Sequence, residues 1–429
     1  MNTVAPAGPR STRERLNATL RRSAEALSPR VLRRTLTELQ SVIEPSVSEV
    51  EGGRRAEGVI AWYARATPAQ RQDMWLLMSE QFTADTNRVK LAQAQYAAAV
   101  GTPDEAAAEV LFRRATVSPR RRLLQRFSAA PGGIRFLVDL RAEMQAQLKS
   151  DRRLRALDVE MEYMFSTWFD VAFLDLRRIS WDSPASLVEK LIKYEAVHDI
   201  RSWDDVKNRL DSDRRCYGFF HPSLPDEPLI FVEVALMDSM AASITPLLDE
   251  GAAPSDLAKA TTAIFYSISN TQTGLRGVSF GDSLIKRVVE TLKAEFPRLK
   301  VFATLSPIPG LRAWMQKAAP AKLLEALDDP LALGPKSPLR VALLGWAAQY
   351  LGKETSDGKP LDAVARFHLG NGARVERLNW AGDPSAKGLR QSYGLMVNYL
   401  YDLRRLDKHR NMLAQGQIPI SGDIEDLYF

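Results

Sequence analysis

Residues 262–306 read "TAIFYSISNTQTGLRGVSFGDSLIKRVVETLKAEFPRLKVFATLS". The segments at the two ends, 262–269 and 299–306, are rich in β-branched and aromatic residues, as strands are. Between them, residues 281–296 carry apolar side chains at helical spacing. The order strand, loop, helix, strand predicts a βαβ unit, in which the two strands are parallel neighbours.

The residues before this unit predict two more strands. "RRCYGFFHP" (214–222) and "EPLIFVEVAL" (227–236) are rich in aromatic and β-branched residues, and the segment that joins them, "HPSLPDE" (221–227), is typical of a turn. We interpret the pair as an antiparallel hairpin. Residues 166–429 are therefore expected to form a mixed α/β or α+β domain.

The first part of the chain predicts helices only. Residues 31–165 contain apolar residues at a period of 3.6, and no alternating pattern that would indicate a strand. A capping residue followed by proline announces three helices, and a Pro-Gly-Gly break separates two others. These signals are Thr67-Pro68, Thr102-Pro103, Ser118-Pro119 and Pro131-Gly132-Gly133. We expect an all-helical bundle over residues 31–165, preceded by a mobile N-terminal arm, residues 1–30.

Length and charge support this division. A chain of 429 residues is expected to hold two or three domains. The net charge is +6, and residues 1–165 carry 26 Lys and Arg against 19 Asp and Glu. Binding of nucleic acid would be one interpretation of the basic half. Because its arginines alternate with acids at helical spacing, solvated helix surfaces are the preferred interpretation, and we expect no nucleic-acid partner.

Composition also limits the compartment and the chemistry. No run of about 18 apolar residues predicts a membrane span, and the N-terminus lacks the apolar region of a secretory signal. An Arg-rich arm would also suit an organellar transit peptide, although Glu14 and Glu25 argue against it. The single cysteine, Cys216, excludes an internal disulfide, so we expect a cytoplasmic protein. No histidines or cysteines have metal-ligand spacing, so no metal is expected.

The loop before the predicted helix has the features of an anion site. Glycines let the backbone approach a ligand closely, and the first amides of a helix attract negative charge. The loop lacks the Gly-Lys-Ser/Thr ending of a P-loop. It resembles the Arg/Gln-x-x-Gly-x-Gly/Ala turn that holds the pyrophosphate of coenzyme A in the GCN5-related acetyltransferase fold, with Ser279 in place of the first glycine. An ordinary glycine-containing helix start is the alternative. The residues concerned are Arg276, Gly277, Val278, Ser279, Phe280, Gly281 and Asp282.

Ser306 stands where ligands gather in a βαβ unit, at the carboxyl end of a strand. Pro307 and Pro309 follow it and restrict the backbone. In the alternative interpretation, "SPIPG" (306–310) is the turn at the start of a helix, with Ser306 as its cap. His368 lies between an apolar run and Gly370-Asn371-Gly372, which predicts a helix or strand end beside a tight turn. Such a place suits an acid–base group.

The other three histidines receive no functional role. His409 lies in a charged segment, "LDKHR" (406–410), and is expected to be exposed. His198 and His221 lie among apolar residues, and their roles stay open.

Several segments together resemble the malonyl-CoA decarboxylase family. They are "HPSLPDEPLIFVEVAL", "FYSISNTQTGLRGVSFGDSLIKRVV", "FATLSPIPG", "FHLGNGA" and "GLMVNYLYDL", in the family's order within residues 214–403. The resemblance implies an acetyltransferase-like catalytic domain with a mixed sheet over residues 166–429, and a helical domain used for oligomerisation. It further implies malonyl-CoA as substrate, a homotetramer, a place in fatty acid metabolism, a coenzyme A loop at 276–282, and Ser306 and His368 as the catalytic pair.

The chemistry that the resemblance implies needs no cofactor. Malonyl-CoA loses CO2, and the thioester accepts the electrons as an enolate. We assign protonation of C2 to His368 and positioning of the carboxylate to Ser306; the family's usual description makes the serine a proton acceptor. Two alternatives stay open: a coenzyme A-dependent acyltransferase to an amine, which would need an acceptor, and a non-catalytic acyl-CoA sensor, which would not need both residues. Fold alone does not decide among these.

Overall fold

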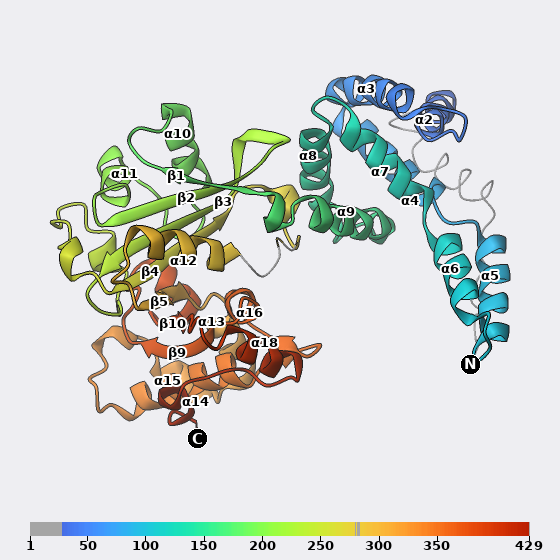
Figure 1. Cartoon of the computed structure of the whole chain (residues 1–429). Coiled ribbons are helices and arrows are strands. Elements are labelled where there is room, and N and C mark those ends of the chain that lie inside the picture. The colour runs from blue at the N-terminus through green and yellow to red at the C-terminus, as the bar shows by residue number, and fades with distance from the viewer. Residues whose placement is uncertain (1–27, 279, 281–283, 429) are drawn as a thin grey trace. The chain divides into compact units, whose positions relative to one another are not determined.

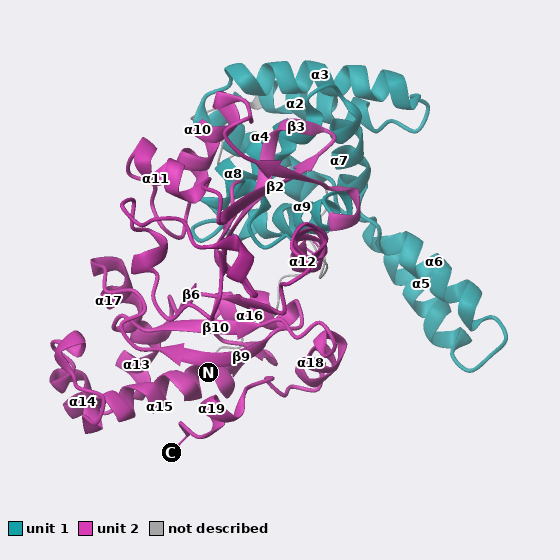
Figure 2. Ribbon diagram, turned by 60° about the vertical axis from the view of Figure 1, so that its left-hand side comes forward, with its two compact units in different colours: residues 1–169, 272–279 teal, residues 170–271, 280–429 magenta. Residues whose placement is uncertain are grey.

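The computed structural model of the chain describes residues 28–278, 280 and 284–428. The chain divides into two compact units, residues 1–169 with 272–279 and residues 170–271 with 280–429 (Figure 2). The segment 272–279 belongs to the first unit, although the residues on both sides of it belong to the second. Most of the predicted N-terminal arm, residues 1–27, lies outside the described residues.

The described part of the first unit is helical, as predicted. Its helices are α2 (Pro29–Val42), α3 (Glu49–Arg65), α4 (Pro68–Gln81), α5 (Thr86–Ala99), α6 (Glu105–Thr116), α7 (Pro119–Ala129), α8 (Gly133–Gln145) and α9 (Arg155–Trp168). Two predicted helix starts are confirmed. Thr67 forms a capping box with Gln70 at α4, and the Ser118 hydroxyl accepts the Arg120 amide at α7. The Pro-Gly-Gly break is confirmed between α7 and α8.

The predicted start at Thr102-Pro103 is wrong. Helix α6 begins at Glu105, and its N-cap residue, Asp104, makes no side-chain capping bond. The Thr102 hydroxyl donates instead to the Ala99 carbonyl at 2.7 Å, at the end of the preceding helix. The same hydroxyl accepts the Asp104 amide at 3.3 Å, so Thr102 lies in the turn between the two helices, and α6 begins two residues later than predicted.

The second unit is built on a mixed sheet, which confirms the predicted α+β class. Within the described residues, eight strands follow the order β1-β2-β3-β4-β5-β10-β6, with β9 paired to β10 (Figure 1). They are β1 (Asp175–Ile179), β2 (Arg214–His221), β3 (Leu224–Met237), β4 (Thr262–Asn270), β5 (Val301–Thr304), β6 (Ser306–Pro307), β9 (Arg374–Asn379) and β10 (Met396–Leu400). A small separate hairpin pairs β7 (Thr355–Ser356) with β8 (Lys359–Pro360).

The predicted pairings are confirmed. Strands β2 and β3 form the antiparallel hairpin, and β4 and β5 are parallel neighbours joined through α12. The helices of this unit are α10 (Ala185–Tyr194), α11 (Trp203–Arg209), α12 (Leu284–Glu295), α13 (Leu311–Ala318), α14 (Ala321–Ala326), α15 (Pro338–Gly352), α16 (Ala363–Gly370), α17 (Ala386–Ser392), α18 (Leu406–Ala414) and α19 (Gly422–Glu425). None of the helices that the structure describes is long and apolar enough to cross a membrane.

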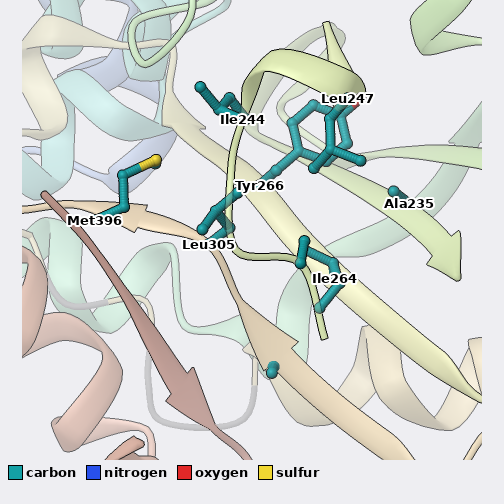
Figure 3. Packing of buried hydrophobic residues seen from close by; sticks show 9 residues of the cluster. Ala235, Ile244, Leu247, Ile264, Tyr266, Leu305 and Met396 are labelled. Atoms are coloured by element: carbon teal, nitrogen blue, oxygen red, sulfur yellow. The ribbon is translucent and has the colours of Figure 1, made fainter. Parts of the chain in front are cut away.

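The centre of the sheet is packed with apolar side chains. Figure 3 shows a buried cluster that includes Ile264 and Tyr266 of β4, Leu305 after β5 and Met396 of β10. Burial of such side chains contributes about 1.5–3 kcal/mol each and holds the strands in register. The cluster therefore gives the polar groups at the strand ends a rigid support.

The sheet opens beyond this cluster. Strand β4 pairs with β5 only as far as Phe265 opposite Thr304, and a last bond runs from the Leu305 amide to the Phe265 carbonyl. Strand β4 continues to Asn270 beside β3, whereas β6 pairs with β10 and not with β4. Among the described residues, the last part of β4 therefore has no partner strand on this edge.

Candidate active site

The structure brings Ser306 and His368 together, 62 residues apart in sequence. The Ser306 Oγ lies 3.2 Å from the His368 Nε2. The two residues are only 5% and 4% exposed, and both line a pocket of about 240 Å³. The pocket lies along the opened edge of β4, and its lining also includes Val197, Phe265, Ser267, Ile268, Asn270, Val364 and Phe367.

A chain of hydrogen bonds assigns the protons of this pair. The Ser306 hydroxyl donates to the Thr304 Oγ1 at 2.8 Å, so its lone pairs are left for the imidazole. The His368 Nε2 must then be the donor toward Ser306, and Nδ1 accepts from the Tyr401 hydroxyl at 2.7 Å. The network therefore assigns the neutral imidazole with its proton on Nε2.

A break between β5 and β6 positions the serine. The Asn398 side chain donates to the Thr304 carbonyl at 2.6 Å, and the Tyr399 amide donates to the Thr304 Oγ1 at 3.1 Å. These bonds satisfy the polar groups of Thr304 where the strand ends, so the chain can re-enter the sheet at Ser306. The alternative role of Ser306 as a helix cap is wrong, because α13 begins after Gly310 and has no side-chain cap.

The histidine lies in the last turn of α16, which confirms the prediction of a helix end beside a tight turn. The Asp362 carboxylate caps the first turn of this helix by accepting the Val364 and Ala365 amides. Gly372, with a φ of +85°, turns the chain after the helix, a conformation that favours glycine. A cap at one end and a turn at the other fix the helix that carries His368.

The surroundings of His368 keep its imidazole uncharged. The ring stacks on Tyr399 with the ring centroids 4.7 Å apart. Burial lowers the pKa of His368 to about 3, because a buried imidazole gains no hydration when it is protonated. Burial likewise raises the pKa of the Tyr401 hydroxyl above its ordinary value. At neutral pH the histidine and the tyrosine of this site are therefore both neutral.

The remaining histidines lie elsewhere. The predicted exposure of His409 is wrong: its ring is buried, and Nδ1 lies 3.0 Å from the Gly372 carbonyl, where it holds α18 against the turn after α16. His221 accepts the Ser223 amide within the β2–β3 turn. His198 is buried beside a separate polar pocket. Neither of these two lines the pocket of Ser306 and His368.

Part of the predicted coenzyme A loop is described. In the first unit, Arg141 donates to the carbonyls of Gly274 and Arg276 at 2.8 and 3.0 Å, and Gly277 has a φ of +82°. The Arg276 side chain is exposed. Val278 and Phe280 are buried, whereas Ser279, Gly281 and Asp282 lie outside the described residues. The assignment of this loop to coenzyme A stays a prediction.

Two tyrosines of the site were not predicted. Tyr399 and Tyr401 contact His368 by stacking and by a hydrogen bond. They stand two residues apart at the end of β10, so they project from the same face of the strand. This alternation is visible in "MVNYLY" (396–401), and it would have placed both tyrosines beside one ligand. In the described parts of the chain, no three histidine, cysteine or carboxylate side chains gather as metal ligands would.

Comparison with known proteins covers both units. The C-terminal domain of the malonyl-CoA decarboxylase family matches residues 172–428, and its N-terminal domain matches residues 82–169. The chain is 36% identical over 394 residues to the mitochondrial malonyl-CoA decarboxylase of Rattus norvegicus, covering 82% of this chain and 80% of that one. It is 34% identical over 392 residues to that of Anser anser anser, covering 82% of this chain and 78% of that one.

Solved structures agree with this result. The malonyl-CoA decarboxylase of Agrobacterium vitis aligns with a TM-score of 0.82 and 40% identity, over 92% of this chain and 100% of that one. That of Rhodopseudomonas palustris aligns with a TM-score of 0.81 and 40% identity, over 92% and 99%. With both domains matched and relatives above 30% identity along most of its length, this chain belongs to the malonyl-CoA decarboxylase family.

Proposed function

We propose that this protein converts malonyl-CoA to acetyl-CoA and CO2, with Ser306 and His368 as its catalytic residues. The observation that carries the proposal is their contact of 3.2 Å inside a buried pocket. Membership of the malonyl-CoA decarboxylase family supports the substrate. The thioester carbonyl accepts the electrons that the departing CO2 leaves behind. The protein therefore needs to supply a few positioned polar groups and a pocket that excludes water.

The open edge of β4 offers a place for the arm of coenzyme A. Beyond Phe265 this edge has no partner strand among the described residues, and Ser267, Ile268 and Asn270 on it line the pocket. An extended chain with amide groups binds such an edge through main-chain hydrogen bonds, as an added strand does. The assignment of the pyrophosphate to the loop of residues Arg276, Gly277, Val278, Ser279, Phe280, Gly281 and Asp282 remains the prediction from the sequence.

Ser306 acts in this proposal as a donor that orients the malonyl carboxylate. Its hydroxyl donates to the Thr304 Oγ1, and rotation about one bond redirects the proton to a ligand. A role as proton acceptor would need a base for the serine, whereas the assigned Nε2 of His368 is a donor. The carboxylate is ionised at neutral pH and has no proton to give. Two donors, Ser306 and His368, would hold it out of the thioester plane.

Loss of CO2 leaves the electron pair in the thioester enolate. Fixed donors lower the barrier, because they need no rearrangement as charge develops. His368, in its protonated form, then delivers a proton to C2. The apolar lining from Val197, Phe265 and Phe367 excludes water from the enolate and strengthens each of these contacts.

The direct test is an assay of the purified protein with malonyl-CoA and no acceptor. We expect acetyl-CoA and CO2 in equal amounts. A requirement for an amine acceptor would favour the acyltransferase. Binding of malonyl-CoA without turnover would favour the sensor.

We also propose that residues 31–165 serve oligomerisation and that the protein is a cytoplasmic homotetramer of fatty acid metabolism. Helices α5 and α6 expose the apolar side chains of Leu91 and Leu111, at 63% and 51%, which supports an interface on this unit. Light scattering of wild type and of a Leu91→Glu, Leu111→Glu double variant tests it. A mass of one chain for the wild type would refute the assembly.

A further inference from the structure

We infer that the site binds a proton together with its carboxylated ligand: the carboxylate of the acyl group makes His368 an imidazolium, and this proton is the one later delivered to C2. The inference rests on the proposed function and deepens it. It explains how the site separates a carboxylated thioester from its decarboxylated product. The carboxylate of the substrate supplies the negative charge opposite His368, which the described residues of the protein do not provide.

The imidazole touches only uncharged groups. Ser306 faces Nε2 and Tyr401 faces Nδ1, while Tyr399 stacks on one ring face and Phe367 lies at the ring edge. A histidine held by a carboxylate would be charged whether or not a ligand were present. Here, among the described residues, the ring is buried with hydroxyl groups as its only polar partners.

The charged groups on neighbouring elements are occupied elsewhere. Asp362 at the start of α16 accepts backbone amides and the Tyr350 hydroxyl. On β9, Arg374 pairs with Glu376. His409 of α18 lies against the Gly372 carbonyl, and Lys359 of β8 is exposed.

Across the pocket, the Glu195 carboxylate accepts hydrogen bonds from Ser267 and Ser269 of β4. Among the described residues, none of these groups contacts the imidazole, and burial alone lowers the pKa of His368 to about 3.

Tyr401 is suited to either protonation state. A phenol hydroxyl donates to a bare Nδ1 and, after rotation, accepts from a protonated one. The partner on the other nitrogen behaves in the same way, because the Ser306 hydroxyl is also both donor and acceptor. The site therefore does not lose a hydrogen bond to the ring when the proton arrives, and only the missing opposite charge keeps the ring neutral.

A bound malonyl carboxylate provides that charge. An opposite charge within about 4–6 Å raises the pKa of a histidine, and more strongly where water is excluded. Without the carboxylate, His368 is almost entirely neutral at pH 7, because burial lowers its pKa to about 3. Ligand binding therefore draws a proton from solvent.

The proton balance of the reaction closes. Binding joins neutral His368, the carboxylate and one proton from water. The bond between C2 and the carboxyl carbon breaks, its electrons form the enolate, and CO2 leaves without charge. The Nε2–H bond then breaks as the new C2–H bond forms, which leaves neutral His368 with its remaining proton on Nδ1. The product carries no carboxylate, so the attraction that held it to the site has gone.

The test uses sulfoacetyl-CoA, whose sulfonate is always ionised and which cannot lose CO2, and acetyl-CoA as its uncharged match. Titration calorimetry in buffers of different ionisation enthalpy counts the protons taken up. We expect close to one proton per sulfoacetyl-CoA at about pH 5 and none per acetyl-CoA, because a nearby opposite charge raises a histidine pKa of about 3 by about three units. Below about pH 6 the affinity for sulfoacetyl-CoA should rise about ten-fold for each unit that the pH falls, with no such slope for acetyl-CoA.

His368→Asn should abolish both the uptake and the slope while acetyl-CoA still binds, which shows that the variant is folded. Equal proton counts for the two ligands, or uptake that survives His368→Asn, would overturn the inference. In either case malonyl-CoA turnover by the wild type is measured on the same sample. Turnover without proton uptake refutes this inference alone, whereas absence of turnover refutes the proposed function.

Discussion

The second unit contains two buried polar clusters that are built in opposite ways. In the charged cluster, Arg209 pairs with Asp205 and Glu233, each at 2.7 Å. In the uncharged cluster, the described contacts of His368 are the hydroxyls of Ser306 and Tyr401 and aromatic rings. Charges that are paired inside the protein stabilise the fold and are not free to bind a ligand. A buried ionisable group that has no charged partner in the protein can pair with the charge of a ligand.

The largest expected effect is at the histidine of the uncharged cluster. His368→Asn should lower the kcat for malonyl-CoA by about 10³-fold, because general acid catalysis contributes 10²–10⁴-fold. The measurement is acetyl-CoA formation by chromatography. His198→Asn is the matched control: it is also buried in this unit, with its pKa lowered to about 4, yet it lies outside the pocket. Equal losses in both variants would break the distinction between catalytic and structural histidines.

The charged cluster should respond in stability. Arg209→Met leaves Glu233 buried without its partner and should lower the free energy of unfolding by about 3–5 kcal/mol. Lys286→Met, which removes an exposed ion pair with Glu290, should cost less than about 1 kcal/mol. Chemical denaturation followed by circular dichroism measures both. A small effect at Arg209 would mean that the charged cluster does not hold the structure.

Ser306→Ala tests the next effect. Loss of one donor to the carboxylate should lower kcat by about 10²-fold, the low end for a placed donor. Thr304→Val keeps the serine but removes the acceptor of its proton, and should cost less, about ten-fold. Steady-state kinetics with malonyl-CoA compares the two. If the Ser306→Ala variant kept the wild-type kcat, Ser306 would have no role in catalysis, and "SPIPG" would serve only as a turn.

The smallest effect concerns acid stability. His368 and His198 have pKa values lowered to about 3 and about 4 in the folded state, whereas the unfolded chain binds these protons near pH 6.5. The stability they confer is therefore present above about pH 6.5 and is lost as the pH falls toward their folded values. Each of the two histidines should lower the free energy of unfolding by about 2 kcal/mol between about pH 7 and pH 5.

Urea unfolding at the two pH values measures this loss, and His198→Asn should remove about half of it. No change on His198→Asn would show that this histidine is already charged in the folded protein.

Much of the fold could be predicted because its signals are local. The strands at 262–269 and 299–306 and the helix between them follow from periodicity, and parallel pairing follows from the connection. Strands β9 and β10 were not predicted. Residues 396–401 are a short apolar run, and pairing with distant β5, β6 and β9 decides their conformation.

The site was partly predictable. Ser306 and His368 stand at element ends with proline or glycine beside them, a local mark that made each a candidate, whereas their pairing followed from the resemblance to the malonyl-CoA decarboxylase family. Tyr401 has no such mark. It is 33 residues from His368 in sequence, and only the fold brings its hydroxyl within 2.7 Å of the His368 Nδ1. The burial of His409 was missed because its sequence neighbours are charged, while the contact that covers it comes from Gly372.

The segment 272–279 decides how the protein can be divided. It belongs to the first unit, where Arg141 of α8 holds the carbonyls of Gly274 and Arg276, yet it is encoded between β4 and α12. A gene cut after residue 169 would therefore give a fragment that carries this segment without the arginine that anchors it. On the proposed role of this segment in holding coenzyme A, ligand binding by such a fragment would be weakened even if its sheet folded. Co-expression of the two fragments would restore the anchor.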